Sequence, residues 1–181
     1  QKEKAEDVIR IFLLGESAAY GDPDSSFGMG RFLEAILKTR YPEQGFEVIN
    51  LAITAINSNV ILPISKELAQ YNADAWMVYM GNNEMVGPYG AGTIFGNKAP
   101  STAYIRTILT LKKLRTVQWL ENTILHKLSD DSLSSQKEWD GVNMFTENKL
   151  RYNDAAKLRA YQNFEKNIAS IFAHAEKKNI P

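Results

Sequence analysis

The stretch VIRIFLLGES, residues 8–17, decides the fold of this 181-residue chain. Residues 8–14 form an apolar run of strand length that contains Val, Ile and Phe, as expected for a strand buried on both faces of a parallel sheet. Gly15, Glu16 and Ser17 end the run, so a serine hydroxyl follows the strand directly. We expect residues 8–14 to be a central strand.

Strand and helix patterns alternate along the next part of the chain. Residues 15–30 are rich in Gly, Ser, Asp and Pro and predict a long loop, and residues 46–51 and 75–80 predict two more strands. Two sets of apolar residues have helical spacing, the second with Pro63 near its first turn: Met29, Phe32, Leu33, Ile36 and Leu37, then Val60, Ile61, Ile64 and Leu68. This order predicts a three-layer α/β/α sandwich with a parallel sheet, whose ligands bind beyond the carboxyl ends of the strands.

The second half of the chain predicts a long connection and two helices. Residues 81–103 hold five glycines and two prolines, with aromatic residues that favour an ordered loop. Apolar residues at helical spacing predict a helix from Leu111 to Leu128 and a last helix over residues 154–177. The apolar face expected for the last helix consists of Leu158, Tyr161, Phe164, Ile168, Ile171, Phe172 and Ala175. Only three strands are predicted, so we expect the sheet to be truncated before its last strands.

Composition bounds the class of protein. Lys plus Arg and Asp plus Glu both number 21, so the formal net charge is zero and nothing favours nucleic acid as a partner. No apolar stretch approaches the ~20 residues of a membrane span, so we expect no membrane contact. The charged residues 1–7 resemble the end of a linker, and the chain has no cysteine. An anchored parent protein whose soluble part works outside the cytoplasm fits both features, although the compartment stays open.

Three positions of interest follow the three predicted strands. Ser17 follows the first strand, Ala52 the second, and Asn83 the third, within Gly81-Asn82-Asn83-Glu84. A hydroxyl and a carboxamide at the same edge of a sheet suit a nucleophile and an oxyanion donor. The alternatives are that Ser17 only caps a loop and that Asn83 only forms a turn.

The blocks Gly15-Glu16-Ser17, Asn50-Leu51-Ala52 and Gly81-Asn82-Asn83-Glu84 together resemble the SGNH, or GDSL-like, hydrolase superfamily. The resemblance implies a flavodoxin-like domain over residues 8–181, with a long insertion at about residues 86–145, and a serine esterase or acyl-ester hydrolase activity. It also implies that Ser17 is the nucleophile, and that the N–H groups of Ser17 and Ala52 form an oxyanion hole with the Asn83 side chain. The substrate would be a small acyl ester or an acetylated sugar, with no cofactor and no metal.

The chain departs from the family pattern at several positions. Glutamates stand at 16 and 84, where the family has aspartates that brace the loop, and Ala52 replaces a glycine. The family's Asp-x-x-His block is missing, because neither His126 nor His174 has an aspartate three residues before it. His174 is expected on the solvated flank of the last helix.

Two interpretations of the missing base stay open. Either the base lies after Pro181 in a longer parent, which leaves this fragment inactive, or the domain has lost catalysis and serves as a binding or scaffolding domain. An uncovered edge of the sheet could also pair with a second copy as a homodimer.

Overall fold

The computed structural model describes residues 3–93, 98–119, 123 and 150–181. Its sheet has three parallel strands in the order β2-β1-β3: β1 (Val8–Gly15) lies between β2 (Gly45–Asn50) and β3 (Ala75–Tyr79). Leu13 is in register with Asn50, and Gly15 with Tyr79, so the carboxyl ends of the strands lie side by side. The order is the beginning of the flavodoxin-like order, and the predicted central position of residues 8–14 is confirmed.

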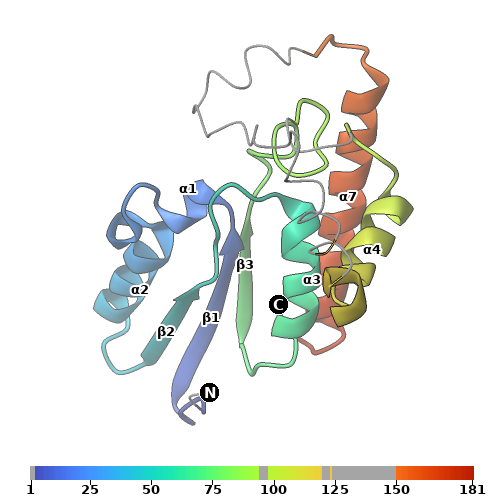
Figure 1. The fold of residues 1–181 in the computed structure, drawn as a ribbon. Helices are drawn as coiled ribbons and strands as arrows, with labels where there is room; N and C mark the ends of the chain where they lie inside the picture. The colour runs from blue at the N-terminus through green and yellow to red at the C-terminus, as the bar shows by residue number, and fades with distance from the viewer. Residues whose placement is uncertain (1–2, 94–97, 120–122, 124–149) are drawn as a thin grey trace.

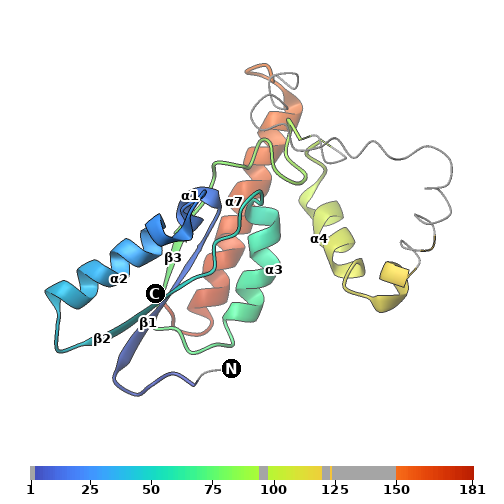
Figure 2. The same ribbon diagram turned by 60° about the vertical axis from the view of Figure 1, so that its left-hand side comes forward.

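Helices cover both faces of this sheet (Figures 1 and 2). Helix α2 (Met29–Arg40) packs on one face next to β2, preceded by the short α1 (Ser17–Tyr20) and a 3-10 turn (Ser25–Phe27). Helices α3 (Ser58–Leu68) and α7 (Ala155–Glu176) pack against each other on the opposite face, with α4 (Thr102–Leu111) beside them. The three-layer sandwich predicted from the sequence is therefore confirmed.

Alternate residues of β1 form the core on the two faces. Phe12 and Leu14 pack with Ile61 of α3 and Ile171 of α7, whereas Leu13 faces the other way. Because side chains alternate along a strand, a central strand supplies apolar residues to both layers, which explains why residues 8–14 carry so few polar side chains.

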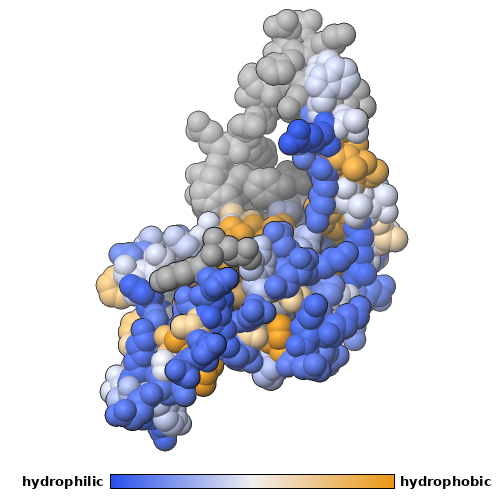
Figure 3. Space-filling model, turned by 90° about the horizontal axis from the view of Figure 1, so that it is seen from below, coloured by the Kyte–Doolittle hydropathy of each residue, from blue (hydrophilic) through white to orange (hydrophobic). Residues whose placement is uncertain are grey.

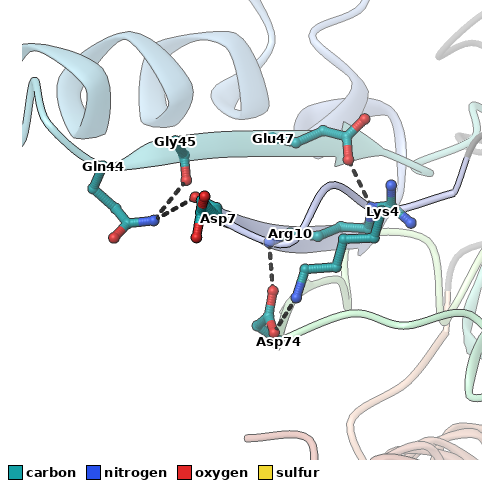
Figure 4. A network of polar contacts seen from close by, with 7 residues as sticks. All are labelled: Lys4, Asp7, Arg10, Gln44, Gly45, Glu47 and Asp74. Atoms are coloured by element: carbon teal, nitrogen blue, oxygen red, sulfur yellow. Dashed lines mark hydrogen bonds and ion pairs between the residues drawn. The ribbon is translucent and has the colours of Figure 1, made fainter.

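A polar network closes the amino end of the sheet, the end opposite the loops that follow the strands (Figure 4). Arg10 is buried in β1 and its Nε lies 2.6 Å from Glu47 Oε2 of β2. Its backbone N–H donates to Asp74 Oδ2 at 2.7 Å, and Lys4 Nζ pairs with Asp74 Oδ1 at 2.5 Å. Seen from this end, the surface of the molecule is largely hydrophilic (Figure 3).

Burial opposes the charged form of Asp74, but the hydrogen bonds from Lys4 and the Arg10 backbone outweigh it. They lower the pKa of Asp74 below its usual value. The ionised carboxylate therefore ties the starts of β1 and β3 together, far from the loops that could form a site.

The second half of the chain differs from the sequence prediction in two ways. A helix was expected from Leu111 to Leu128, but α4 ends at Leu111. A turn over residues 112–114 separates it from a helical segment at residues 115–119. Most of the remaining residues of the predicted helix lie outside the described part of the chain. The described part of the 81–103 segment is irregular, as expected. Its Ala91 and Ala99 pack on Ala160 of α7, which anchors this loop to the helix.

The apolar face predicted for α7 is wrong in part. Leu158, Tyr161 and Phe172 are about half exposed, whereas Asn163 and Asn167 are buried. Asn163 accepts a hydrogen bond from the Thr102 hydroxyl and donates to the Pro100 carbonyl. Hydrogen bonding to neighbouring elements, which apolar periodicity does not record, decides which side of this helix faces inward.

Candidate functional site at the carboxyl ends of the strands

The loops after the three strands meet at one edge of the sheet, the upper edge in Figure 1. The Leu51 N–H donates to the Leu13 carbonyl at 2.8 Å, and the Ile53 N–H donates to the Gly15 carbonyl at 3.2 Å. The backbone after β2 thus continues alongside the end of β1. Gly15 itself has no room for a side chain, because an added Cβ would collide with the Tyr79 carbonyl of β3 and with Ala19.

Glu16 joins the loop that carries Ser17 to the loop that carries Asn83. Its side chain is fully buried, and its two carboxylate oxygens accept the N–H groups of Gly81 at 3.3 Å and of Asn83 at 3.0 Å. Burial raises the pKa of Glu16, and the backbone donors oppose this effect. The glutamate therefore braces the Asn83 loop, the role that the family resemblance implied for this position.

Gly81 gives this loop its sharp turn. Its φ of 129° lies in a region that side-chain-bearing residues rarely adopt. The loop reverses immediately after β3, and the N–H groups of Gly81 and Asn83 both point toward the Glu16 carboxylate.

Glu84 connects the same loop to the helices on the other face. Its carboxylate accepts the N–H of Ser58 at 2.8 Å and the hydroxyl of Ser58 at 2.9 Å, at the first residue of α3. The Ser58 hydroxyl in turn accepts a hydrogen bond of 3.0 Å from Asn167 of α7. Burial raises the pKa of Glu84 to about 7, and the nearby Glu16 adds to the rise while Ser58 opposes it.

Asn83 directly precedes Glu84 in the loop after β3 and is half-buried. Its Nδ2 donates to the Ile56 carbonyl at 2.9 Å, and its own carbonyl accepts the N–H groups of Val86 and Gly87. A carboxamide nitrogen has two hydrogens, so one N–H of Asn83 remains for another acceptor. The turn-forming role and an oxyanion-donor role are therefore compatible in this residue.

Ala52 is buried against Leu13 and Ala19, and its backbone does not adopt the positive φ that would favour glycine. The methyl group that replaces the family's glycine thus fits without backbone strain. The Ala52 N–H, however, donates to Asn50 Oδ1 at 3.1 Å. Asn50 also donates to the carbonyls of Ala19 and Tyr20, at 3.4 and 3.3 Å.

The sequence shows Asn50 only as the first residue of the block Asn50-Leu51-Ala52 and predicts no role for its side chain. The structure shows that its side chain fastens the loop after β2 to helix α1. The signal available in the sequence was its position as the last residue of β2, in register with Leu13 of the central strand.

Ser17 is half-buried at the first position of α1, immediately after the buried Glu16. Neither its hydroxyl nor its N–H makes a hydrogen bond within the part of the chain that the structure describes. The first N–H groups of a helix have no partner inside the helix, so the Ser17 N–H is free to donate.

His174 lies away from these loops. Its Nδ1 is 2.9 Å from the hydroxyl of Ser65 in α3. Ser65 lies seven residues after Ser58, the first residue of that helix, which is roughly 10 Å further along the helix axis. Burial, followed by the charges of Lys177, Lys66 and Arg106, lowers the pKa of His174. His174 is thus half-buried and hydrogen-bonded, not the solvated flank residue that the sequence suggested, and His126 lies outside the described residues.

No group of three or more His, Asp or Glu side chains suited to a metal ion occurs among the residues described. Over those residues, no helix is both long and apolar enough to cross a membrane. The polar groups described at the strand ends are the Ser17 hydroxyl, the buried carboxylates of Glu16 and Glu84 and several amide donors.

Comparisons with known proteins give distant structural likenesses. A serine-to-alanine variant of the esterase AlinE4 has 13% identity and a TM-score of 0.42, and the match covers 98% of this chain and 76% of the other. An aspartate-to-alanine variant of AlinE4 has 14% identity and a TM-score of 0.42, with the same coverage of both chains. TesA has 15% identity and a TM-score of 0.37, and the match covers 94% of this chain and 75% of TesA. No family model and no curated protein matches the sequence.

Proposed function

We propose that this chain is a serine esterase or acyl-transfer domain of the SGNH type, with Ser17 as the nucleophile. One observation carries the proposal: Glu16, the residue before Ser17, holds the Asn83 N–H at 3.0 Å through its buried carboxylate. A hydroxyl and a carboxamide are thereby fixed in adjacent loops. Because the structural likenesses are distant, the proposal rests on these contacts within the chain.

In the proposed reaction, Ser17 Oγ attacks the carbonyl carbon of an ester while a base takes the hydroxyl proton. The carbonyl oxygen becomes an oxyanion, which the N–H of Ser17 and the free N–H of Asn83 stabilise. The alcohol then leaves as the carbonyl re-forms, and water or a second alcohol releases the acyl group from Ser17. The Ala52 N–H contributes only if it shares its bond with Asn50.

Among the residues that the structure describes, no side chain accepts a hydrogen bond from the Ser17 hydroxyl as a general base would. A serine hydroxyl attacks poorly at its free pKa, and the one histidine among the described residues, His174, bonds to Ser65 at the far part of α3. The proposal therefore expects slow acylation of Ser17 in this chain. Imidazole added to the solution should accelerate it by acting as the base.

Acetylation by p-nitrophenyl acetate tests the proposal, with peptide mass spectrometry to locate the acetyl group. We expect imidazole-dependent acetylation at Ser17, lost in Ser17→Ala and retained in Ser25→Ala, which removes an exposed serine eight residues away. Equal labelling of Ser17 and Ser25 would contradict the proposal, because it would mean that Ser17 has no advantage over a solvated hydroxyl.

A second candidate is a binding domain that keeps the fold without turnover. The observation in its favour is that the Ala52 N–H and one Asn83 N–H are already bonded, to Asn50 and to Ile56. This candidate predicts that Ser17 is acetylated no faster than the exposed Ser25. It also predicts that Ser17→Ala leaves the affinity for the bound ligand unchanged. The acetylation experiment therefore separates the two functions.

A further inference from the structure

A groove with a volume of about 310 Å³ lies between α3, α4 and α7, apart from the loops around Ser17. This volume is at the lower end of the range found for small-molecule sites. The Arg106 guanidinium of α4 donates to the Ser170 hydroxyl of α7 at 3.0 Å, and Ile105 of α4 is buried, so α4 is fixed against the other helices. The groove is therefore a structural feature of three packed helices.

Three cations line this groove: Lys66 from α3, Arg106 from α4 and Lys113 from the turn after α4. Helix α7 adds His174, whose lowered pKa favours the neutral imidazole. The lining contains no aspartate or glutamate. Since the whole chain has a formal net charge of zero, the groove is a local concentration of positive charge.

None of these cations is neutralised by an acidic partner within the residues described. The four ion pairs found there join Lys4 to Asp74, Arg10 to Glu47, and both Arg31 and Lys38 to Glu34. The charges of Lys66 and Arg106 are felt inside the groove, because both help to lower the pKa of His174 after the larger effect of burial. An anion bound there would reduce this repulsion.

Apolar side chains also line the groove. Leu62, Ile105 and Leu109 line it together with the cations, and Asn167 lies among the lining residues as well. A ligand that fits would combine an anionic group with a small apolar body. A guanidinium offers a planar pair of donors that matches phosphate oxygens, and lysines add charge without a fixed geometry.

We propose that the groove between α3, α4 and α7 binds a small organic phosphate, with the phosphate held by Lys66, Arg106 and Lys113 and the organic part against Leu62 and Leu109. The cations are exposed, so binding weakens as salt concentration rises. The site is independent of Ser17 and of the proposed acyl chemistry.

Phenyl phosphate is the probe, and the side-chain NMR signals of His174 report its binding. We expect a saturable shift of these signals and a rise in the pKa of His174, with inorganic phosphate binding more weakly because it lacks the apolar part. Each of Lys66→Gln and Lys113→Gln should weaken the affinity about threefold to fivefold, as expected for exposed charge pairs.

Lys177→Gln is the matched control. Lys177 follows α7 and also lowers the pKa of His174, but it does not line the groove. Like Lys66 and Lys113, it lies near the C-terminus of a helix, where a lysine stabilises the helix dipole without binding any ligand. Its substitution should leave the affinity for phenyl phosphate unchanged. The proposal is overturned if phenyl phosphate gives no saturable shift, if inorganic phosphate binds equally well, or if Lys177→Gln weakens binding as much as Lys66→Gln.

Discussion

Glu84→Gln should remove a pH-dependent loss of stability that the buried carboxylate causes. In the folded chain Glu84 is 5% exposed, and burial together with the nearby Glu16 raises its pKa from 4.5 to about 7. Below pH 4.5 the carboxyl is protonated in both the folded and the unfolded chain. Between pH 4.5 and about 7 the unfolded chain ionises this carboxyl while the folded chain keeps it protonated, so stability falls over this range and the loss is complete above about 7.

The magnitude follows from this difference in pKa. A rise from 4.5 to about 7 is about 2.5 units, and each unit corresponds to about 1.4 kcal/mol, so ionisation of Glu84 lowers the free energy of unfolding by about 3 kcal/mol. Glutamine has the same shape, accepts the Ser58 N–H, and can donate to the Ser58 hydroxyl in place of accepting from it. The variant therefore keeps the contacts and loses the charge.

Urea unfolding below pH 4.5 and above pH 7 measures this effect. The free energy of unfolding of Glu84→Gln, minus that of the unchanged chain, should rise by about 3 kcal/mol between the two conditions. Glu67→Gln, which removes an exposed carboxylate from α3, the helix that Glu84 contacts, controls for overall charge. A difference that stays constant with pH would refute the reasoning, because it would mean that Glu84 is solvated in the folded chain.

Three further substitutions test other parts of the fold. Gly15→Ala should destabilise the chain by about 3 kcal/mol or more and lower its Tm, because the added Cβ collides with the Tyr79 carbonyl. Asn167→Ala should lower the free energy of unfolding in urea by about 1–3 kcal/mol, since it removes two buried hydrogen bonds. Asp74→Asn should destabilise the chain at neutral pH, and the loss should vanish as the pH falls below 3.8, because the pKa of Asp74 is lowered in the folded chain and the ion pair with Lys4 disappears on protonation.

The sheet and most of its helices follow from local patterns in the sequence. The apolar run of residues 8–14 predicts a strand buried on both faces, and Phe12, Leu13 and Leu14 are indeed buried. The last helix was predicted over residues 154–177 and extends over Ala155–Glu176. Both are long, strongly patterned segments whose structure depends on burial of apolar side chains.

The parts that could not be predicted depend on hydrogen bonds between distant residues. Asn167 appears polar in an apolar pattern, but it bonds to Ser58 and Asn59, which are more than a hundred positions away in the chain. The role of Asn50 and the identity of the partner of Glu84, Ser58, likewise depend on contacts between distant residues. A single sequence shows the positions of such side chains after the strands, but not the donors that they meet.

The most direct test of the central claim compares the rates at which Ser17 is acetylated by p-nitrophenyl acetate with imidazole in Asn83→Ala and in Asn82→Ala. Asn82 is the exposed neighbour in the same loop, so its loss controls for changes in the loop itself. If the Asn83 carboxamide stabilises the oxyanion, Asn83→Ala should slow the reaction about 10²-fold or more, and Asn82→Ala should leave it nearly unchanged. Equal rates in the two variants would contradict the claim that Ser17 and Asn83 act on one substrate carbonyl.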